Sequence, residues 1–170
     1  AGKNATGDLP AYNHQEGQVP WAHQVDAEAV AAYTERNAGC FACPIRCARV
    51  TRVKSGPHAG HLEGPEYETL DALGPMCGIE DLEVIMHANR LCDDLGLDTI
   101  STGTIIAFAM ECRQRGLLTD EEHALTWGDP DTVLGLIEDI AHRRGLGDLL
   151  AEGTRRAARE IGGEAPHFAM

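Results

Sequence analysis

The chain has 170 residues, enough for one domain with a sizeable core, and its 43% hydrophobic and 24% charged residues exclude wholesale disorder. Asp and Glu outnumber Lys and Arg by 27 to 14, and the net charge of −13 argues against binding to nucleic acid or to an anionic membrane surface. No apolar run has transmembrane length, and residues 1–20 lack the basic start and apolar core of a signal peptide. We therefore expect a cytoplasmic protein.

Apolar periodicity predicts a mostly α fold, with residues 1–170 forming a single helical domain. Residues 1–25 are expected to be an irregular segment, because glycines and prolines interrupt any period there. A helix that Asp26 can cap is expected to run toward the first cysteine. Residues 49–53 are then expected to form a short strand, followed by a loop at 55–60.

Five further helices are expected in the rest of the chain. They cover 67–73, 81–95 and 102–115, then a segment that begins at Asp129 and a last one at 148–161. The pattern at 102–115 is apolar nearly all round, which predicts a helix buried at the centre of the domain.

Three cysteines, Cys40, Cys43 and Cys47, lie within eight residues and make 39–50 a Cys-rich loop. Thiolates at this spacing can converge on one side of a turning backbone, as the ligands of a cubane iron–sulfur cluster do. The surrounding arginines favour thiolate over thiol and would balance a negatively charged cluster. The triplet is therefore a candidate cluster site.

Two other interpretations of the triplet stay open. His58 or His61 would complete a zinc site, and three small buried residues would need no ligand at all. The remaining cysteines, Cys77, Cys92 and Cys112, lie on apolar helix faces or beside loops, so we expect them in the core.

Two carboxylates flank the end of the predicted helix at 81–95. Asp93 and Asp98 stand on either side of Gly96, and a pair of carboxylates at such a turn can accept N–H donors from the edge of a planar ring such as a pterin. The alternative is that Asp98 simply caps the next helix.

A second acidic group lies at the start of the predicted helix at 67–73 and consists of Glu63, Glu66 and Glu68, with Tyr67 among them. Acids this close raise one another's pKa when desolvated, which suits a general acid or base. The alternative is a solvated helix N-terminus, where acids interact favourably with the helix dipole.

Four motifs occur in an order and spacing that closely resemble the tungsten-containing aldehyde:ferredoxin oxidoreductase family. They are GCFACPIRCARV at 39–50, EGPEYE at 63–68, LG at 73–74 and CDDLGLDTISTG at 92–103. The stretch at 145–154 is similar to the family as well, and the resemblance runs from about Leu9 to the end of the chain.

The resemblance implies an irregular helical domain like domain 2, the middle domain of a three-domain enzyme whose domains 1 and 3 are missing here. It implies oxidation of aldehydes to carboxylic acids at a tungsten or molybdenum bis-pterin centre. Electrons would leave through a 4Fe–4S cluster to ferredoxin or another electron-transfer protein. The isolated domain is expected to be inactive.

By the same resemblance, the triplet Cys40, Cys43 and Cys47 supplies three cluster ligands, and a fourth cysteine comes from the missing third domain. Asp93 and Asp98, with the Leu97 backbone, correspond to a pterin-binding motif. Glu68 corresponds to the catalytic acid beside the metal, a proton carrier.

Two alternative functions remain. One is a reductive tungstoenzyme subunit that acts on aryl acyl thioesters or carboxylic acids, and the other is a zinc-binding structural module. Relatives with an iron between subunits carry Glu-x-x-His where this chain has His87-Ala-Asn-Arg90. That departure puts the iron-bridged dimer in doubt and leaves a homo-oligomer open.

Overall fold

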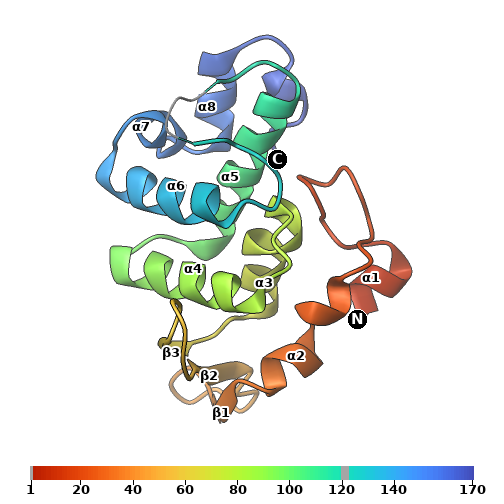
Figure 1. Cartoon of the computed structure of the whole chain (residues 1–170), viewed down its shortest axis with the longest axis vertical. Coiled ribbons are helices and arrows are strands. Elements are labelled where there is room, and N and C mark those ends of the chain that lie inside the picture. The colour runs from red at the N-terminus through yellow and green to blue at the C-terminus, as the bar shows by residue number, and fades with distance from the viewer. Residues whose placement is uncertain (1, 120–122) are drawn as a thin grey trace.

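The computed structural model describes residues 2–119 and 123–170, with a small sheet below a stack of helices (Figure 1). The described α-helices are α1 (Gly2–Thr6), α2 (Ala27–Ala31), α3 (Tyr67–Leu73), α4 (Leu82–Leu95), α5 (Thr99–Gln114), α6 (Pro130–His142), α7 (Leu146–Leu150) and α8 (Thr154–Ile161). Short 3₁₀ turns lie at Ala22–Gln24, Pro75–Cys77 and Ala165–His167. The mostly α prediction is confirmed. Within the described ranges, no helix combines the length and apolar character needed to traverse a bilayer.

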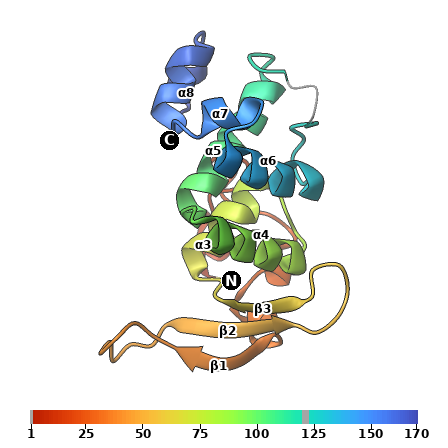
Figure 2. The ribbon, with the colours of Figure 1, turned by 90° about the vertical axis from the view of Figure 1, so that its left-hand side faces the viewer.

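The sheet consists of β1 (Thr34–Ala38), β2 (Ala48–Val53) and β3 (Gly60–Glu63), antiparallel and in that order. In its register Arg36 lies opposite Val50, and Thr51 lies opposite Leu62. The third strand packs against α4, which joins the sheet to the helices. The hairpin of β1 and β2 extends away from the helical stack (Figure 2). The sheet thus places the loop between β1 and β2 away from the helices and places β3 against α4.

Four aspartates act as N-caps, and they fix where the principal helices begin. Asp26 caps α2, Asp81 caps α4, Asp98 caps α5 and Asp129 caps α6, each by accepting a backbone N–H bond. Each such cap stabilises its helix by about 1 kcal/mol. The predicted helix starts at Asp26 and Asp129 are confirmed, and so is the capping alternative for Asp98.

The structure corrects three of the predicted elements. The helix that begins at Asp26 ends at Ala31, and the chain then enters β1, because backbone pairing with β2 satisfies its hydrogen bonds better than helix continuation does. The segment 1–25 contains α1, so it is not wholly irregular. The last predicted helix, 148–161, is two helices that meet near Gly153.

The core is centred on α5, as the apolar pattern predicts. Ile106, Phe108 and Met110 are fully buried, and α5 packs closely against α3. At that crossing a Cβ on Gly103 would lie 2.4 Å from the Ala72 carbonyl oxygen, so the two backbones approach more closely than any side chain permits. This packing fixes α3, and with it the acidic residues at its start.

Glu111 is a charged residue in this core, with only 1% of its surface exposed. Its carboxylate accepts hydrogen bonds from Asn13 Nδ2 at 2.6 Å and from Arg115 Nε at 2.7 Å. Asn13 Oδ1 is itself buried without a hydrogen-bond partner, so the side-chain hydrogen bonds of Asn13 are those that Nδ2 donates. The carboxylate therefore ties the N-terminal segment to α5.

We expect Glu111→Leu to lower the free energy of unfolding by about 2 kcal/mol, since a buried donor that loses its partner costs about 1–3 kcal/mol. Urea unfolding of the chain measures this loss. Glu111→Gln keeps an acceptor oxygen and serves as the matched control, with an expected loss of about 1 kcal/mol. A urea midpoint for Glu111→Leu equal to that of the unsubstituted chain would contradict the prediction.

Candidate functional site

The cysteine triplet lies on the loop between β1 and β2, at the end of the hairpin that extends from the body. Cys40 and Cys47 are exposed, and Cys43 is half-buried. The Cys43 N–H donates to the Cys40 carbonyl oxygen at 3.0 Å, which forms a turn between the first two thiols. At the base of the loop a Cβ on Gly39 would lie 2.8 Å from the Arg46 Cα, so only glycine lets the two stems come this close.

The loop fits an iron–sulfur cluster in the type and number of its thiols, because cysteine thiolates are the ligands that such clusters take. In the part of the chain that the structure describes, no group of three His, Cys, Asp or Glu side chains is gathered as a metal site. The structure therefore shows one short loop with three thiols. Their role as ligands stays a prediction.

The histidines that the zinc interpretation requires have other partners. His61 pairs with Glu35, and the His58 ring packs against the His87 ring at a centroid distance of 4.9 Å. Arg90 Nη2 in turn donates a hydrogen bond to His87 Nδ1 at 2.9 Å. Both candidate fourth ligands are thus engaged away from the triplet.

The other three cysteines are core residues, as expected. Cys77, Cys92 and Cys112 are fully buried, and burial raises the pKa of each thiol to about 12. They remain protonated at neutral pH and have no access to solvent. Only the exposed loop carries thiols suited to ligation.

A polar pocket of about 560 Å³ lies between the sheet and α4. It starts at Ala48, the residue that directly follows Cys47, and reaches Asp93 near the end of α4. Most of its lining residues are polar or charged, and they come from β3, the loop before α3, α3, α4 and the start of α5. They include His61, Glu63, Glu66, Thr69, Asn89, Arg90, Asp94 and Thr99. The loop and the pocket therefore adjoin at Ala48, the first residue of β2.

Asp93 is the predicted site residue that faces this pocket. The pKa of its carboxyl is raised, first because neighbouring atoms remove water from it and then because Asp94 and Glu63 add negative charge nearby. Asn89 Nδ2 opposes this shift by donating a hydrogen bond to Asp93 Oδ2 at 2.7 Å. A Cβ on Gly64 would lie 2.5 Å from Asn89 Oδ1, so a side chain at position 64 would clash with Asn89.

The raised pKa makes the contribution of Asp93 to stability depend on pH. Its folded-state pKa lies above the unfolded value, so the folded chain is favoured most below the unfolded pKa. This contribution is lost as the pH rises through the folded-state pKa. Wherever Asp93 is ionised, its partly desolvated charge therefore lowers the stability of the fold.

We expect Asn89→Leu to raise the pKa of Asp93 further, because the hydrogen bond that favours the carboxylate is removed. A carboxyl-carbon NMR titration measures the shift. Asp98 provides the control within the same spectra, because its own bond from the Ser101 backbone is untouched. An Asp93 pKa that does not change would show that Asn89 has no influence on the carboxylate.

Asp98 and Leu97 occupy a different position from Asp93. Asp98 accepts a hydrogen bond from the Ser101 N–H at 2.7 Å and caps α5. Hydrogen bonding to the Ser101 side chain, and then to its backbone, lowers the pKa of Asp98. The Leu97 N–H donates to the Cys92 carbonyl oxygen at 2.8 Å and completes the turn after α4. Neither residue lines the pocket, although Thr99, the residue after Asp98, does.

Glu68 lies half-buried on the first turn of α3 and does not line the pocket either. The Tyr67 hydroxyl donates to Glu68, and this bond raises the pKa of Tyr67. Glu66, two residues earlier, is the acid of this motif that faces the pocket beside Glu63. The structure thus separates Glu68 from Asp93 and brings Glu66 toward it.

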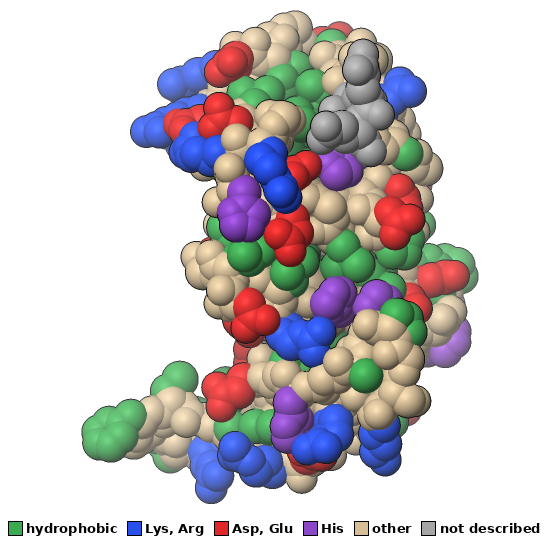
Figure 3. All heavy atoms as spheres, turned by 60° about the vertical axis from the view of Figure 1, so that its left-hand side comes forward, with side chains coloured by type: hydrophobic (Ala, Val, Ile, Leu, Met, Phe, Trp, Pro, Cys, Tyr) green, Lys and Arg blue, Asp and Glu red, His purple; other side chains and the backbone are tan. Residues whose placement is uncertain are grey.

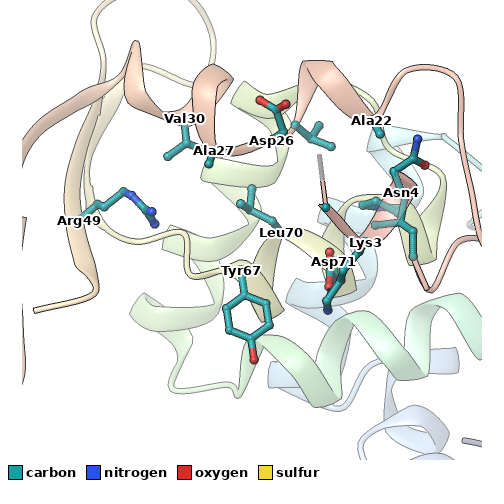
Figure 4. A pocket seen from close by; sticks show the side chains of 14 residues that line it. Lys3, Asn4, Ala22, Asp26, Ala27, Val30, Arg49, Tyr67, Leu70 and Asp71 are labelled. Carbon is teal, nitrogen blue, oxygen red and sulfur yellow. The ribbon is translucent and has the colours of Figure 1, made fainter. Parts of the chain in front are cut away.

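A second cavity, of about 330 Å³ and more apolar, lies where α1 and α2 meet α3 (Figure 4). Leu70 and Val30 contribute to its wall. Lys3 pairs with Asp71, and its ammonium lies 4.9 Å from the Tyr67 ring centroid. None of the predicted site residues lines it.

A family model matches almost the whole chain. The model describes aldehyde ferredoxin oxidoreductase, domains 2 and 3, and it covers residues 2–170. This chain belongs to the aldehyde ferredoxin oxidoreductase family. The resemblance that the sequence motifs indicated is therefore confirmed.

Tungsten-containing members of the aldehyde ferredoxin oxidoreductase family match nearly the whole chain. The tungsten-containing aldehyde ferredoxin oxidoreductase of Pyrococcus furiosus is 48% identical over 164 residues, which are 94% of this chain and 27% of that protein. The protein of the same name from Thermococcus kodakarensis is 45% identical over 172 residues, covering 98% of this chain and 28% of that protein. The chain thus spans about a quarter of the length of these curated relatives.

Two other proteins that match this chain are enzymes of different names. An aliphatic sulfonate oxidoreductase, WOR-like subunit, of Pyrococcus furiosus is 40% identical over 124 residues, 71% of this chain and 20% of that protein. A solved structure, the active-site complex BamBC of benzoyl coenzyme A reductase with 1,5-dienoyl-CoA, aligns with a TM-score of 0.68 and 28% identity. It covers 84% of this chain and 21% of that one. The fold is therefore shared with a reductase.

Some residues of the polar pocket were not predicted from the sequence. Asn89, Thr69 and Thr99 line it, and the two threonine hydroxyls share a hydrogen bond at 2.8 Å between α3 and α5. Asn89 precedes Asp93 by four residues on one helix, so helical spacing alone could have identified that pair. The threonine pair spans separate helices, and local spacing carries no signal for it.

Proposed function

We propose that this chain is the part of a cytoplasmic tungstoenzyme that holds a 4Fe–4S cluster beside a bis-pterin centre of tungsten or molybdenum. The reaction converts an aldehyde and water into a carboxylic acid, two protons and two electrons. A 4Fe–4S cluster held by Cys40, Cys43 and Cys47 would supply one-electron transfer to ferredoxin or another electron-transfer protein. The rest of the enzyme, domains 1 and 3, supplies the remaining contacts.

The observation that carries this proposal is the continuity between the cysteine loop and the polar pocket. Cys47 ends the loop, and Ala48 begins the pocket wall that leads to Asp93. The start of β2 therefore lies between the cysteine sulfurs of the loop and the carboxylate oxygens of the pocket. That arrangement suits an electron path from a cofactor in the pocket to a cluster in the loop.

Each chain residue has a distinct proposed role. Cys40, Cys43 and Cys47 ligate the cluster. Asp93 accepts N–H donors from the pterin ring, and the Leu97 backbone and Asp98 hold the turn that presents it. When bound, the tungsten centre supplies the two-electron oxidation, and the cluster supplies one-electron transfer.

Glu68 is the proposed proton carrier of the reaction. Oxidation of the hydrated aldehyde releases protons, and a positioned carboxylate accepts one of them efficiently. The Tyr67 hydroxyl that donates to Glu68 holds this carboxylate on the first turn of α3. Glu66 in the polar pocket is the competing acid.

A reductive tungstoenzyme is the second candidate. The structural neighbour at 28% identity is an active-site complex of benzoyl coenzyme A reductase, which favours an aryl acyl thioester as substrate. A carboxylic acid substrate belongs to the same class. The loop and pocket would serve the same cofactors, with electrons moving in the opposite direction.

Metal analysis and turnover of the holoenzyme, purified without oxygen, test these proposals together. We expect iron with acid-labile sulfide, tungsten or molybdenum, and aldehyde-dependent reduction of a viologen dye. Reduction of an acyl thioester without aldehyde oxidation would select the reductive candidate. Stoichiometric zinc without iron would overturn both and leave a zinc-binding structural module.

A further inference from the structure

The apolar cavity where α1 and α2 meet α3 has no part in the proposed function, and its walls differ from those of the polar pocket. Its volume of about 330 Å³ is at the lower end of the range of about 300–1,000 Å³ found for small-molecule pockets. Apolar side chains form most of its lining. They are Leu9, Ala22, Val25, Ala27, Val30, Leu70 and Pro75. The cavity therefore suits a small ligand with an apolar body.

Three of the charged side chains in its wall already have partners. Lys3 pairs with Asp71 on the side of the cavity away from Arg49 (Figure 4). The Asp26 carboxylate caps α2 by accepting hydrogen bonds from two backbone N–H groups, at 3.0 and 3.1 Å. The charges of Lys3, Asp71 and Asp26 are therefore satisfied within the fold.

Arg49 is the charged residue of this wall that has no partner. Among the residues that the structure describes, its guanidinium takes part in no ion pair and no side-chain hydrogen bond. Arg49 is half-buried, and Figure 4 shows its side chain extending from β2 toward Leu70. Arg36 and Arg52, cations of the same sheet, are exposed instead, and Figure 3 shows Lys and Arg side chains on the outer surface at that end of the molecule. A guanidinium beside apolar walls is suited to bind a carboxylate.

We propose that this cavity binds a small apolar monocarboxylic acid, with its carboxylate on Arg49 and its hydrocarbon part against Val30 and Leu70. Binding makes and breaks no covalent bond. An acid of this class is the product of aldehyde oxidation, so its role as product rests on the proposed function.

The cavity adjoins the proposed proton carrier. Tyr67 lines the cavity, and its hydroxyl donates to Glu68, the next residue on α3. A product acid held in the cavity therefore lies beside the turn of α3 that carries Glu68. We expect such an acid to inhibit aldehyde oxidation.

The charges of the wall favour a monocarboxylate over other ligands of similar size. A neutral amide would leave the half-buried Arg49 without an anionic partner, and an amine would meet it as a like charge. A dicarboxylate would bring a second negative charge toward Asp26 or Asp71. One carboxylate at one end of an apolar body is therefore the best match.

The test measures binding of hexanoate and of neutral hexanamide to the holoenzyme by calorimetry. Arg49→Gln removes the cation of the cavity, and Arg36→Gln, which removes an exposed cation from the neighbouring strand, is its matched control. Ala27→Phe fills the cavity from an exposed position on the first turn of α2. Ala31→Phe, also exposed on α2 but outside the cavity wall, is the second control.

Hexanoate is expected to bind the unsubstituted enzyme about tenfold more tightly than hexanamide, and Arg49→Gln should lose this preference because the charged donor is gone. Ala27→Phe should weaken binding of both compounds about tenfold, since the added ring takes the place of the hydrocarbon part. It lies outside the cysteine loop, so this effect is separate from any disturbance of the thiols. Both control variants should bind as the unsubstituted enzyme does, and hexanoate should inhibit the oxidation of hexanal.

Equal binding of hexanamide and hexanoate would overturn the proposal, as would hexanoate binding that neither Arg49→Gln nor Ala27→Phe changes. An absence of hexanoate binding to the holoenzyme would overturn it as well and would show that the rest of the enzyme fills the cavity. Hexanoate that binds without inhibiting hexanal oxidation would overturn its role as product.

The proposed function is tested separately by the same samples. Aldehyde oxidation with a viologen dye would still support that function if hexanoate does not bind. Conversely, an enzyme that binds hexanoate in the cavity but oxidises no aldehyde would overturn the proposed function alone.

Discussion

Replacing Cys43 by Ala in the holoenzyme is expected to remove iron and acid-labile sulfide and to abolish ferredoxin reduction. Cys43 is the middle thiol of the loop, so its loss leaves the loop with two of its three candidate ligands. The loss of turnover should exceed about 100-fold, the upper end of what removal of an outer-shell partner of a metal costs. Metal analysis and ferredoxin-linked turnover measure the two effects.

Cys112→Ala is the matched control for this experiment. Cys112 is fully buried on α5, and its pKa of about 12 keeps it a protonated core thiol. Its replacement should lower stability modestly and leave iron and turnover intact. Full iron content in Cys43→Ala would remove this residue from the ligand set.

Glu68→Gln is expected to lower kcat by about 10²–10⁴-fold while the metal and pterin contents stay normal, since that is the range of general acid–base catalysis. Glutamine keeps the size of the side chain and the hydrogen bond with Tyr67, but it cannot carry a proton. The KM for aldehyde should change little. Steady-state kinetics with a viologen dye measure both constants.

Glu66→Gln separates the two acids of this motif. Glu66 faces the polar pocket together with Asp93, whereas Glu68 does not line it. If Glu66→Gln loses turnover and Glu68→Gln keeps it, the proton carrier is Glu66 and the assignment of Glu68 is wrong. If Glu68→Gln alone loses turnover, the assignment stands.

Much of the helical fold could be predicted from local sequence signals. Aspartate caps and apolar spacing are properties of contiguous residues, so α3 and the starts of α2 and α6 were found from them. The strand β1 was not found, because its residues are mostly polar and exposed on both faces. It exists through pairing with β2 across the cysteine loop, a contact that local periodicity does not encode.

The candidate site could be predicted only in part for a related reason. The cysteine triplet is contiguous, so its spacing alone identified the loop. The polar pocket is assembled from β2, β3, α3, α4 and α5, and only their packing decides that Glu66 rather than Glu68 lines it together with Asp93. The order of motifs indicated the family, but the direction in which each acid points depends on helix rotation.

The narrow base of the cysteine loop also bears on how a metal would be captured. Because the stems meet at Gly39 and Arg46, the intervening residues form a closed ring before any ligand arrives. A closed ring samples fewer conformations than an open segment of equal length, so less entropy is lost when three sulfurs settle on one partner. The affinity of the loop for a metal would therefore depend on Gly39, a residue that has no side chain with which to bind it.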